Sequence, residues 1–429
     1  MQSYTNVHLN KKLIKIKKAE GIYLYTDNKK ILDTTSGSNH FATLGWGNKE
    51  VISSMQNQLK KFTHIDIKSW HDENLDKLSR LVVSKKKHKL DKVFFAGNSG
   101  AEACEAAMRM SYQYFFNLGF KKKKFFISRK QSYHGCTTFA LSASDRPNYN
   151  YLKPILAKNV HKISQHHYDY EKRNNETEEE YALRSSKELE AKILSIGPEK
   201  ICGFIAETIM GGLQGDVPPV KNYWKYIRAV CNKYKIHLII DEVYCGMGTT
   251  GKIYCIDYDK ITPDFIFVGK TLAAGYAPLS MVLTSSKIVN NFQKSNQRIP
   301  FSSTHQGYSL GVAAALSVQK TMHKQSTLNH INDMSKYIEH CLKSELENNS
   351  LFRNIRGRGL RMSLEYKCKN KNEFGLELSE RMLKKHNILI DAKWHRICIT
   401  PAVIINKNQT DFFLDKLIKE FKILSKEFQ

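Results

Sequence analysis

IHLIIDE at residues 236–242 and FIFVGKT at residues 265–271 are two apolar runs that each end in charged residues. Runs of β-branched and aromatic residues without polar alternation are typical of central strands in a parallel sheet covered on both faces. The carboxyl ends of such strands meet at one edge of the sheet, where open α/β folds bind ligands. Asp241 and Lys270 are therefore expected to lie close together at a binding site.

The pairing of an acid with an amine narrows the kind of ligand that fits this edge. A charge buried without a partner costs roughly several kcal/mol, so both side chains need one. Pyridoxal phosphate uses both groups, because a lysine amine forms a Schiff base with its aldehyde and an acid keeps its ring nitrogen protonated. A structural ion pair between Asp241 and Lys270, or a lysine merely solvated at a strand end, is the alternative interpretation.

Three segments around the strand ends carry more specific information: DEVYCGMGTTG at 241–251, PD at 263–264 and GKTLAAGYAPL at 269–279. Together they resemble the signature of class III aminotransferases, pyridoxal phosphate enzymes of fold type I. The resemblance extends from about Gly21 to about Leu417 and implies an α/β fold. A large domain at 66–310 is expected to hold a mostly parallel seven-stranded sheet covered by helices, and both chain ends, 1–65 and 311–429, are expected to build a smaller α+β domain.

Ser99, Gly100 and Ala101 are expected to bind the cofactor phosphate. They follow an apolar strand expected at 93–96 and begin a helix, so unpaired backbone N–H groups and the positive helix end face whatever binds there. Ser99 and Glu102 also match a capping box, which would look identical in the sequence. The resemblance implies that the segment does both.

Four other side chains are implied to surround the cofactor ring. The resemblance places Tyr133 on one ring face, where stacking adds roughly 0.5–1.5 kcal/mol beyond burial. Val243 packs on the opposite face, because residues two apart in an extended chain face the same side. His134 is either a proton carrier or a hydrogen-bonded structural histidine. Glu207, which ends an apolar run, is implied to pair with a mobile arginine or to contact the ring's hydroxyl side.

Three further residues are connected with the substrate and with a second subunit. Asn39 lies in a glycine-punctuated loop where the family often has an aromatic residue that lines the substrate pocket. Arg396 lies where many members carry an arginine for the substrate carboxylate, although it could instead cap a surface strand. Thr304 matches a threonine that reaches the cofactor phosphate of the neighbouring subunit, which implies a homodimer with composite sites and leaves a tetramer open.

Local patterns predict several elements outside the strand ends. Apolar residues around a polar turn predict a hairpin over residues 21–33. The acidic run at 171–180 is expected to be a solvated loop that leads into a helix over 188–193. Helical spacing predicts a closing helix over 410–421.

The composition fits a globular enzyme better than a membrane or nucleic-acid-binding protein. The 429 residues are 41% hydrophobic and 25% charged, and they contain no apolar run of about eighteen residues, so no membrane span is predicted. Nine cysteines without a C-x-x-C pair fit reduced thiols and no metal site. Lysines interrupt the apolar residues of the first eighteen positions, so no signal peptide is recognised and a cytoplasmic protein is expected.

The net charge of +26 raises the question of a nucleic-acid partner. The densest lysine runs, at 85–87 and 121–124, belong to lysines spread along the chain without an aromatic-studded basic module. A solvated surface that attracts anionic cofactor and substrate is therefore the expected explanation, and no nucleic-acid partner is expected.

The resemblance to class III aminotransferases implies transamination. An amino group would move from a primary amine or ω-amino acid to a 2-oxo acid, with pyruvate favoured, through a Schiff base at Lys270. An aminomutase or racemase on the same scaffold is the alternative, because cofactor motifs do not distinguish these outcomes. A non-catalytic basic binding protein is the remote one.

Overall fold

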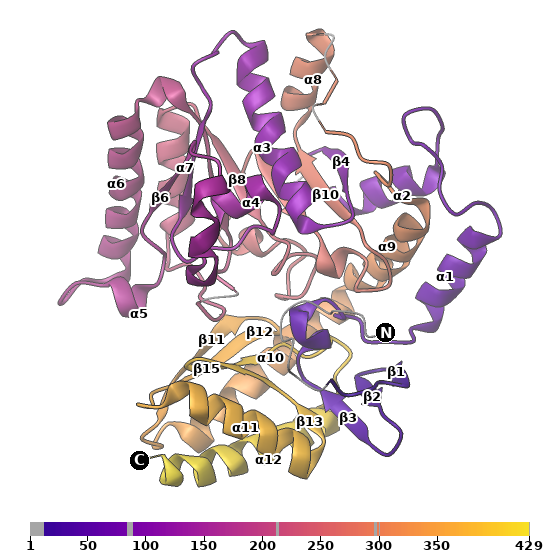
Figure 1. The fold of residues 1–429 in the computed structure, drawn as a ribbon, viewed down its shortest axis with the longest axis vertical. Coiled ribbons are helices and arrows are strands. Elements are labelled where there is room, and N and C mark those ends of the chain that lie inside the picture. The colour runs from indigo at the N-terminus through magenta and orange to yellow at the C-terminus, as the bar shows by residue number, and fades with distance from the viewer. Residues whose placement is uncertain (1–12, 84–88, 212–213, 296–297, 300, 429) are drawn as a thin grey trace.

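The computed structural model describes residues 13–83, 89–211, 214–295, 298–299 and 301–428. Residues 1–12 of the first segment and the lysine run at 85–87 lie outside the described residues. Figure 1 shows a larger layered part and a smaller part below it, in which the first strands of the chain lie beside its last helices.

A seven-stranded sheet forms the centre of the larger part. Its strands are β4 (Lys92–Gly97), β5 (Phe125–Arg129), β6 (Val160–Ile163), β7 (Ile201–Glu207), β8 (His237–Asp241), β9 (Phe265–Val268) and β10 (Ser280–Thr284). They lie in the order β4-β10-β9-β8-β7-β5-β6. β10 runs antiparallel to β4 and β9, whereas the pairs from β9 through β6 are parallel. The expected mostly parallel sheet is confirmed.

Helices cover both faces of this sheet and create two apolar cores. Ile239 and Phe267 point into one core, and their neighbours Leu238 and Ile266 point into the other. The first core is completed by α3 (Gly100–Asn117), α4 (Thr138–Ala143) and α8 (Ser286–Lys294), and the second by α2 (Glu73–Val82), α6 (Glu178–Ile196) and α7 (Tyr223–Lys233). Because both faces are buried, the strands need continuous apolar runs, as their sequences show.

The smaller part contains two four-stranded sheets and the last helices. The first sheet consists of β1 (Lys18–Glu20), β2 (Tyr23–Tyr25), β3 (Lys30–Asp33) and β13 (Ile388–Leu389), and the second of β11 (Phe352–Arg358), β12 (Arg361–Tyr366), β15 (Arg396–Ile399) and β14 (Asp391–Lys393). The helices are α10 (Gln325–Leu346), α11 (Lys371–His386) and α12 (Lys407–Glu427). β13 pairs in parallel with β3, with Ile388 opposite Leu32. The expected construction from both chain ends is confirmed, whereas the boundaries at 65/66 and 310/311 stay a prediction.

Two helices connect the parts. α9 (Ser309–Met322) contributes Val312 to the core of the larger part and Val318 to that of the smaller part, and α1 (Lys49–Leu59) packs against it. α9 therefore holds the two cores together on one side of the molecule.

One local prediction is wrong. Residues 171–180 do not form a continuous loop, because α5 (Tyr168–Glu171) precedes them and α6 begins at Glu178. Thr177 caps α6 in a capping box, in which its backbone N–H donates to the Glu180 carboxylate at 2.8 Å. The acidic run lies at the positive end of the helix, where carboxylates are stabilised.

Within the described part of the chain, no helix is long and apolar enough to cross a membrane. The same residues contain no group of three or more histidine, cysteine or acidic side chains that could hold a metal ion.

Candidate active site

The charged ends of neighbouring strands face one cavity. Asp241 ends β8, Glu207 lies opposite it at the end of β7, and Lys270 begins the turn directly after β9. The cavity measures ≈ 1140 Å³ and takes its lining from both parts of the molecule. Its lining includes ten of the residues expected from the sequence: Asn39, Ser99, Gly100, Ala101, Tyr133, His134, Glu207, Asp241, Val243 and Lys270.

Asp241 is held by two hydrogen bonds and keeps capacity for more. Its Oδ2 lies 2.7 Å from His134 Nδ1, and its Oδ1 accepts from the Val243 backbone N–H at 3.0 Å. Burial lowers the pKa of His134, against the opposing effect of Asp241, so the imidazole is neutral and its single proton faces the carboxylate. A carboxylate has about four lone-pair positions, so Asp241 can still accept a proton-bearing ring nitrogen.

The first turn of α3 forms another wall. Ser99 caps the helix, and Glu102 accepts the backbone N–H groups of Asn98 at 2.8 Å and Ser99 at 2.9 Å. The next N–H groups, of Gly100 and Ala101, have no acceptor within the helix because of their position in its first turn. The capping box is therefore present, and the first turn still offers donors to an anion at the edge of the cavity.

Gly100 also allows the helix to approach Val243. A Cβ at position 100 would lie 2.8 Å from both methyl carbons of Val243. A side chain there would therefore push Val243 away from the cavity wall, next to the strand end that carries Asp241.

The pKa of the Lys270 amine is lowered, so more of it is unprotonated near neutral pH than in an ordinary lysine. Burial lowers its pKa to about 8, and the positive charges of Arg361, Arg146 and Lys393 act in the same direction, whereas Asp241 opposes them. Its Nζ lies 5.3 Å from the centroid of the Tyr244 ring. An amine with a lowered pKa is a better nucleophile near neutral pH than an ordinary lysine.

Tyr133 and Glu207 form the wall beside Asp241. The Arg146 guanidinium carbon lies 4.0 Å from the centroid of the Tyr133 ring. Burial raises the pKa of Glu207 to about 8, and its Oε2 has no hydrogen-bond partner among the described residues. Glu207 is therefore a neutral carboxyl group near neutral pH and can donate a proton into the cavity.

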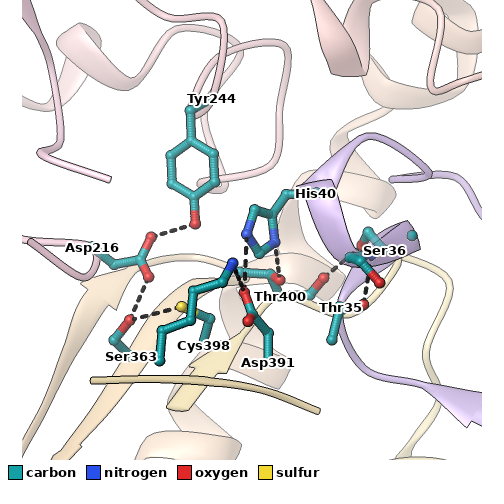
Figure 2. A network of polar contacts seen from close by, with 12 residues as sticks. Thr35, Ser36, His40, Asp216, Tyr244, Ser363, Asp391, Cys398 and Thr400 are labelled. Carbon is teal, nitrogen blue, oxygen red and sulfur yellow. Dashed lines mark hydrogen bonds and ion pairs between the residues drawn. The ribbon is translucent and has the colours of Figure 1, made fainter. Parts of the chain in front are cut away.

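The wall formed by the smaller part was not predicted. Figure 2 shows the Tyr244 hydroxyl donating to Asp216 Oδ1, and the Ser363 hydroxyl donating to Asp216 Oδ2, at 2.6 Å in both cases. Because Ser363 belongs to β12, this bridge ties the larger part to the smaller one. The three residues lie far apart in the sequence, and only Tyr244 belongs to a recognised motif, so the folded chain is what connects them.

His40 and Asp391 lie on the same wall (Figure 2). His40 Nδ1 is 2.6 Å from Thr400 Oγ1, and its Nε2 is 3.8 Å from Asp391 Oδ2. Burial, followed by the charge of Arg361, holds the pKa of His40 well below its ordinary value, so its imidazole is neutral. Asn39 next to it also lines the cavity, and its contact with the substrate stays a prediction.

Two residues expected at the site, Thr304 and Arg396, lie outside the cavity lining of the chain. Thr304 is exposed, and its carbonyl oxygen accepts from His64 Nε2 at 2.9 Å. Arg396 is only 1% exposed, which contradicts a surface cap, and its guanidinium carbon lies 5.1 Å from the Trp394 ring centroid. The contact of Thr304 with a second subunit and the substrate role of Arg396 stay predictions.

The residues present fit pyridoxal phosphate. The cavity combines a lysine amine with a lowered pKa, a buried carboxylate with free lone pairs and a helix N-terminus, which match the aldehyde, the ring nitrogen and the phosphate of the cofactor. Lys270, Asp241 and the first turn of α3 would hold these groups, and the bound ring would supply an electron sink for carbanion chemistry.

Comparisons with known proteins agree with this assignment. Residues 4–421 match the family model described as aminotransferase class-III. An uncharacterized aminotransferase of Schizosaccharomyces pombe is 34% identical over 420 residues, covering 94% of this chain and 91% of that protein. Gamma aminobutyrate transaminase 2 of Solanum lycopersicum is 32% identical, covering 96% and 92%.

This chain also has the fold of a solved transaminase structure. The omega transaminase of Pseudomonas jessenii in complex with PMP superposes with a TM-score of 0.91 at 27% identity, covering 100% of this chain and 97% of that one. The fold is therefore fold type I, and pyridoxal phosphate is indicated as the cofactor. The alternative of a non-catalytic binding protein is wrong. The chain belongs to the class III aminotransferases and carries out pyridoxal phosphate-dependent transamination.

Proposed function

We propose that this aminotransferase takes the amino group of a primary amine or ω-amino acid and passes it to pyruvate in preference to other 2-oxo acids. The observation that carries the donor class is the cavity, which extends from Lys270 to Asp391 on the smaller part. Its ≈ 1140 Å³ exceed the roughly 300–1,000 Å³ of ordinary ligand pockets, leaving room beyond the cofactor. The names of the tomato and Pseudomonas relatives point to the same donor class.

Three side chains have distinct tasks in this proposal. The Lys270 amine, with its pKa of about 8, accepts and returns the proton at the substrate carbon. Asp241 places its carboxyl group next to the position of the ring nitrogen, oriented by His134. Ser99, at the start of α3, orients the helix end towards the phosphate.

We also propose a homodimer with composite sites, in which Thr304 reaches the phosphate of the neighbouring subunit, and a cytoplasmic enzyme. Thr304 is exposed on its own chain, as such a contact requires. The nine cysteines are all free thiols, which suits a reducing compartment. Sedimentation of the holoenzyme and cofactor retention in Thr304→Ala test the dimer, and a monomeric, fully active enzyme would contradict it.

A matrix of amine donors against pyruvate and 2-oxoglutarate tests the substrate proposal. Amino transfer requires an acceptor, whereas an aminomutase or racemase converts its substrate without one, so each donor is assayed with and without pyruvate. We expect carbonyl product and alanine only when both are present. Product without an acceptor would favour isomerisation, and equal rates with 2-oxoglutarate would contradict the acceptor preference.

Lys270→Ala provides the internal control. The purified variant is expected to lose both amino transfer and the visible absorbance of bound cofactor, because no other lysine is placed at the end of β9. Absorbance that survives the substitution would contradict the assignment of Lys270.

A further inference from the structure

The described lining of the cavity includes three basic side chains, those of Lys270, Lys393 and Arg146. They differ in whether another group compensates their charge. Lys270 is assigned to the cofactor, and burial lowers its pKa to about 8. Lys393 forms an ion pair with Asp391 at 2.7 Å, so its charge is already compensated. This leaves Arg146 as the cation to explain.

Among the residues that the structure describes, none accepts a hydrogen bond from the guanidinium of Arg146. None of them forms an ion pair with it, and its Nε is buried without a partner. Its contact with the ring face of Tyr133, at 4.0 Å, offsets part of the charge but satisfies none of the five N–H donors. A half-buried guanidinium with open donors at a cavity wall is suited to a planar oxyanion.

Arg146 also lies near the reacting groups. Its charge contributes to the lowered pKa of Lys270 and opposes the burial effect on the pKa of Glu207, so it is within electrostatic range of both. An anion bound by Arg146 would therefore lie in the same cavity as the Lys270 amine. Arg396, expected from the sequence for this task, is buried outside the cavity lining.

We infer that Arg146 binds the carboxylate of the 2-oxo acid acceptor and of carboxylate-bearing amine donors. The inference rests on the proposed function, which requires both kinds of substrate to use one cavity. A guanidinium can bind a carboxylate through two parallel N–H groups, and the Tyr133 ring packs against the guanidinium of Arg146. Neutral amines would bind in the same cavity without using Arg146.

The test compares substrates with and without a carboxylate on the holoenzyme. Half-reactions are followed by cofactor absorbance with pyruvate, 4-aminobutyrate and the neutral donor benzylamine. In Arg146→Gln, kcat/KM for pyruvate and 4-aminobutyrate is expected to fall about 10- to 100-fold, as for a lost charge-assisted hydrogen bond, while that for benzylamine changes little. Arg146→Lys, which keeps the charge but not the fork, is expected to lie in between.

Two further measurements separate binding from folding effects. The dissociation constant of propionate, an unreactive monocarboxylate, is measured by calorimetry and is expected to weaken with Arg146→Gln by a similar factor. The affinity for pyridoxal phosphate is expected to stay unchanged. Arg109→Gln, which removes an exposed arginine paired with Glu105 on α3, is the matched control.

Specific results would overturn the inference. An equal loss for benzylamine, a fall in cofactor affinity without carboxylate discrimination, or a selective loss in Lys393→Gln instead would each remove Arg146 from this role. A parent enzyme that transfers no amino group from any donor would mean failure of the proposed function itself. An active enzyme with unselective losses in Arg146→Gln would overturn only the assignment of Arg146.

Discussion

Asp216→Ala would break the hydrogen-bonded bridge between the two parts of the molecule. Asp216 is 1% exposed and accepts from the Tyr244 and Ser363 hydroxyls at 2.6 Å each. A hydrogen bond to a charged group contributes roughly 1.5–3 kcal/mol, so the loss of both is expected to lower the free energy of unfolding by about 3–6 kcal/mol. Tyr244→Phe or Ser363→Ala removes one donor and is expected to cost about half as much.

The double variant Tyr244→Phe/Ser363→Ala sharpens the reasoning. It removes both hydroxyls while the carboxylate of Asp216 stays buried, so its cost is expected to exceed the sum of the two single variants. An additive result would mean that the carboxylate finds other partners or reaches water when the hydroxyls are absent.

Urea unfolding of the cofactor-free protein measures these effects, with the midpoint converted through the slope of the transition. Ser286→Ala is the matched control, because the Ser286 hydroxyl also donates to a carboxylate, that of Asp91. The Asp91 side chain is 26% exposed and can be hydrated. In the variant it still accepts the backbone N–H of residue 286, which lies at 2.6 Å. Its expected cost is at most about 1 kcal/mol. If Asp216→Ala costs no more than this control, the bridge does not stabilise the fold.

Three other outcomes are expected. The rate at which the cofactor-free protein takes up pyridoxal phosphate should rise with pH and level off above about 8, because the pKa of Lys270 is lowered from 10.5 to about 8; a rate still rising at pH 10 would contradict this. Gly100→Ala should lower the free energy of unfolding measured in urea by about 1–3 kcal/mol, and Val243→Ala should partly restore it, because the added Cβ would meet the Val243 methyl carbons at 2.8 Å. Since burial raises the pKa of Glu207 from 4.5 to about 8, its stability contribution is present below pH 4.5 and lost as pH rises through 8. Glu207→Gln should therefore gain stability relative to the parent between pH 5 and pH 8.5, and urea midpoints that stay parallel would exclude a raised pKa.

Much of the larger part could be predicted because its central strands are buried on both faces. The continuous apolar runs at 236–242 and 265–271 contain β8 and β9, and the apolar run that ends at Glu207 forms β7. β10 was not predicted, since its five residues lie between a glycine-rich motif and a helix and its antiparallel direction depends on its neighbours. The start of α6 was missed because acidic residues indicate solvent exposure whether or not they form a helix.

The residues of the site likewise divide into those that the sequence predicted and those that it did not. Asp241 and Lys270 were predicted from a local motif that ends two strands, and both line the cavity. Arg146 and Asp216 lie in segments without periodicity, and their chemistry depends on which partners folding places beside them. For Arg146 the informative property is the absence of an acceptor among the described residues, which no sequence pattern encodes.

The parallel pairing of β3 with β13 has a consequence for biosynthesis. The Thr34 hydroxyl donates to the Leu389 carbonyl oxygen at 2.9 Å across a sequence separation of 355 residues. At roughly 5–20 residues per second, a ribosome needs about 20–70 s to synthesise the chain between these two residues. During that time the outer edge of β3 lacks its partner strand β13. An unpaired strand edge can pair with other chains, so we expect chaperone supply and translation speed to influence the yield of native enzyme.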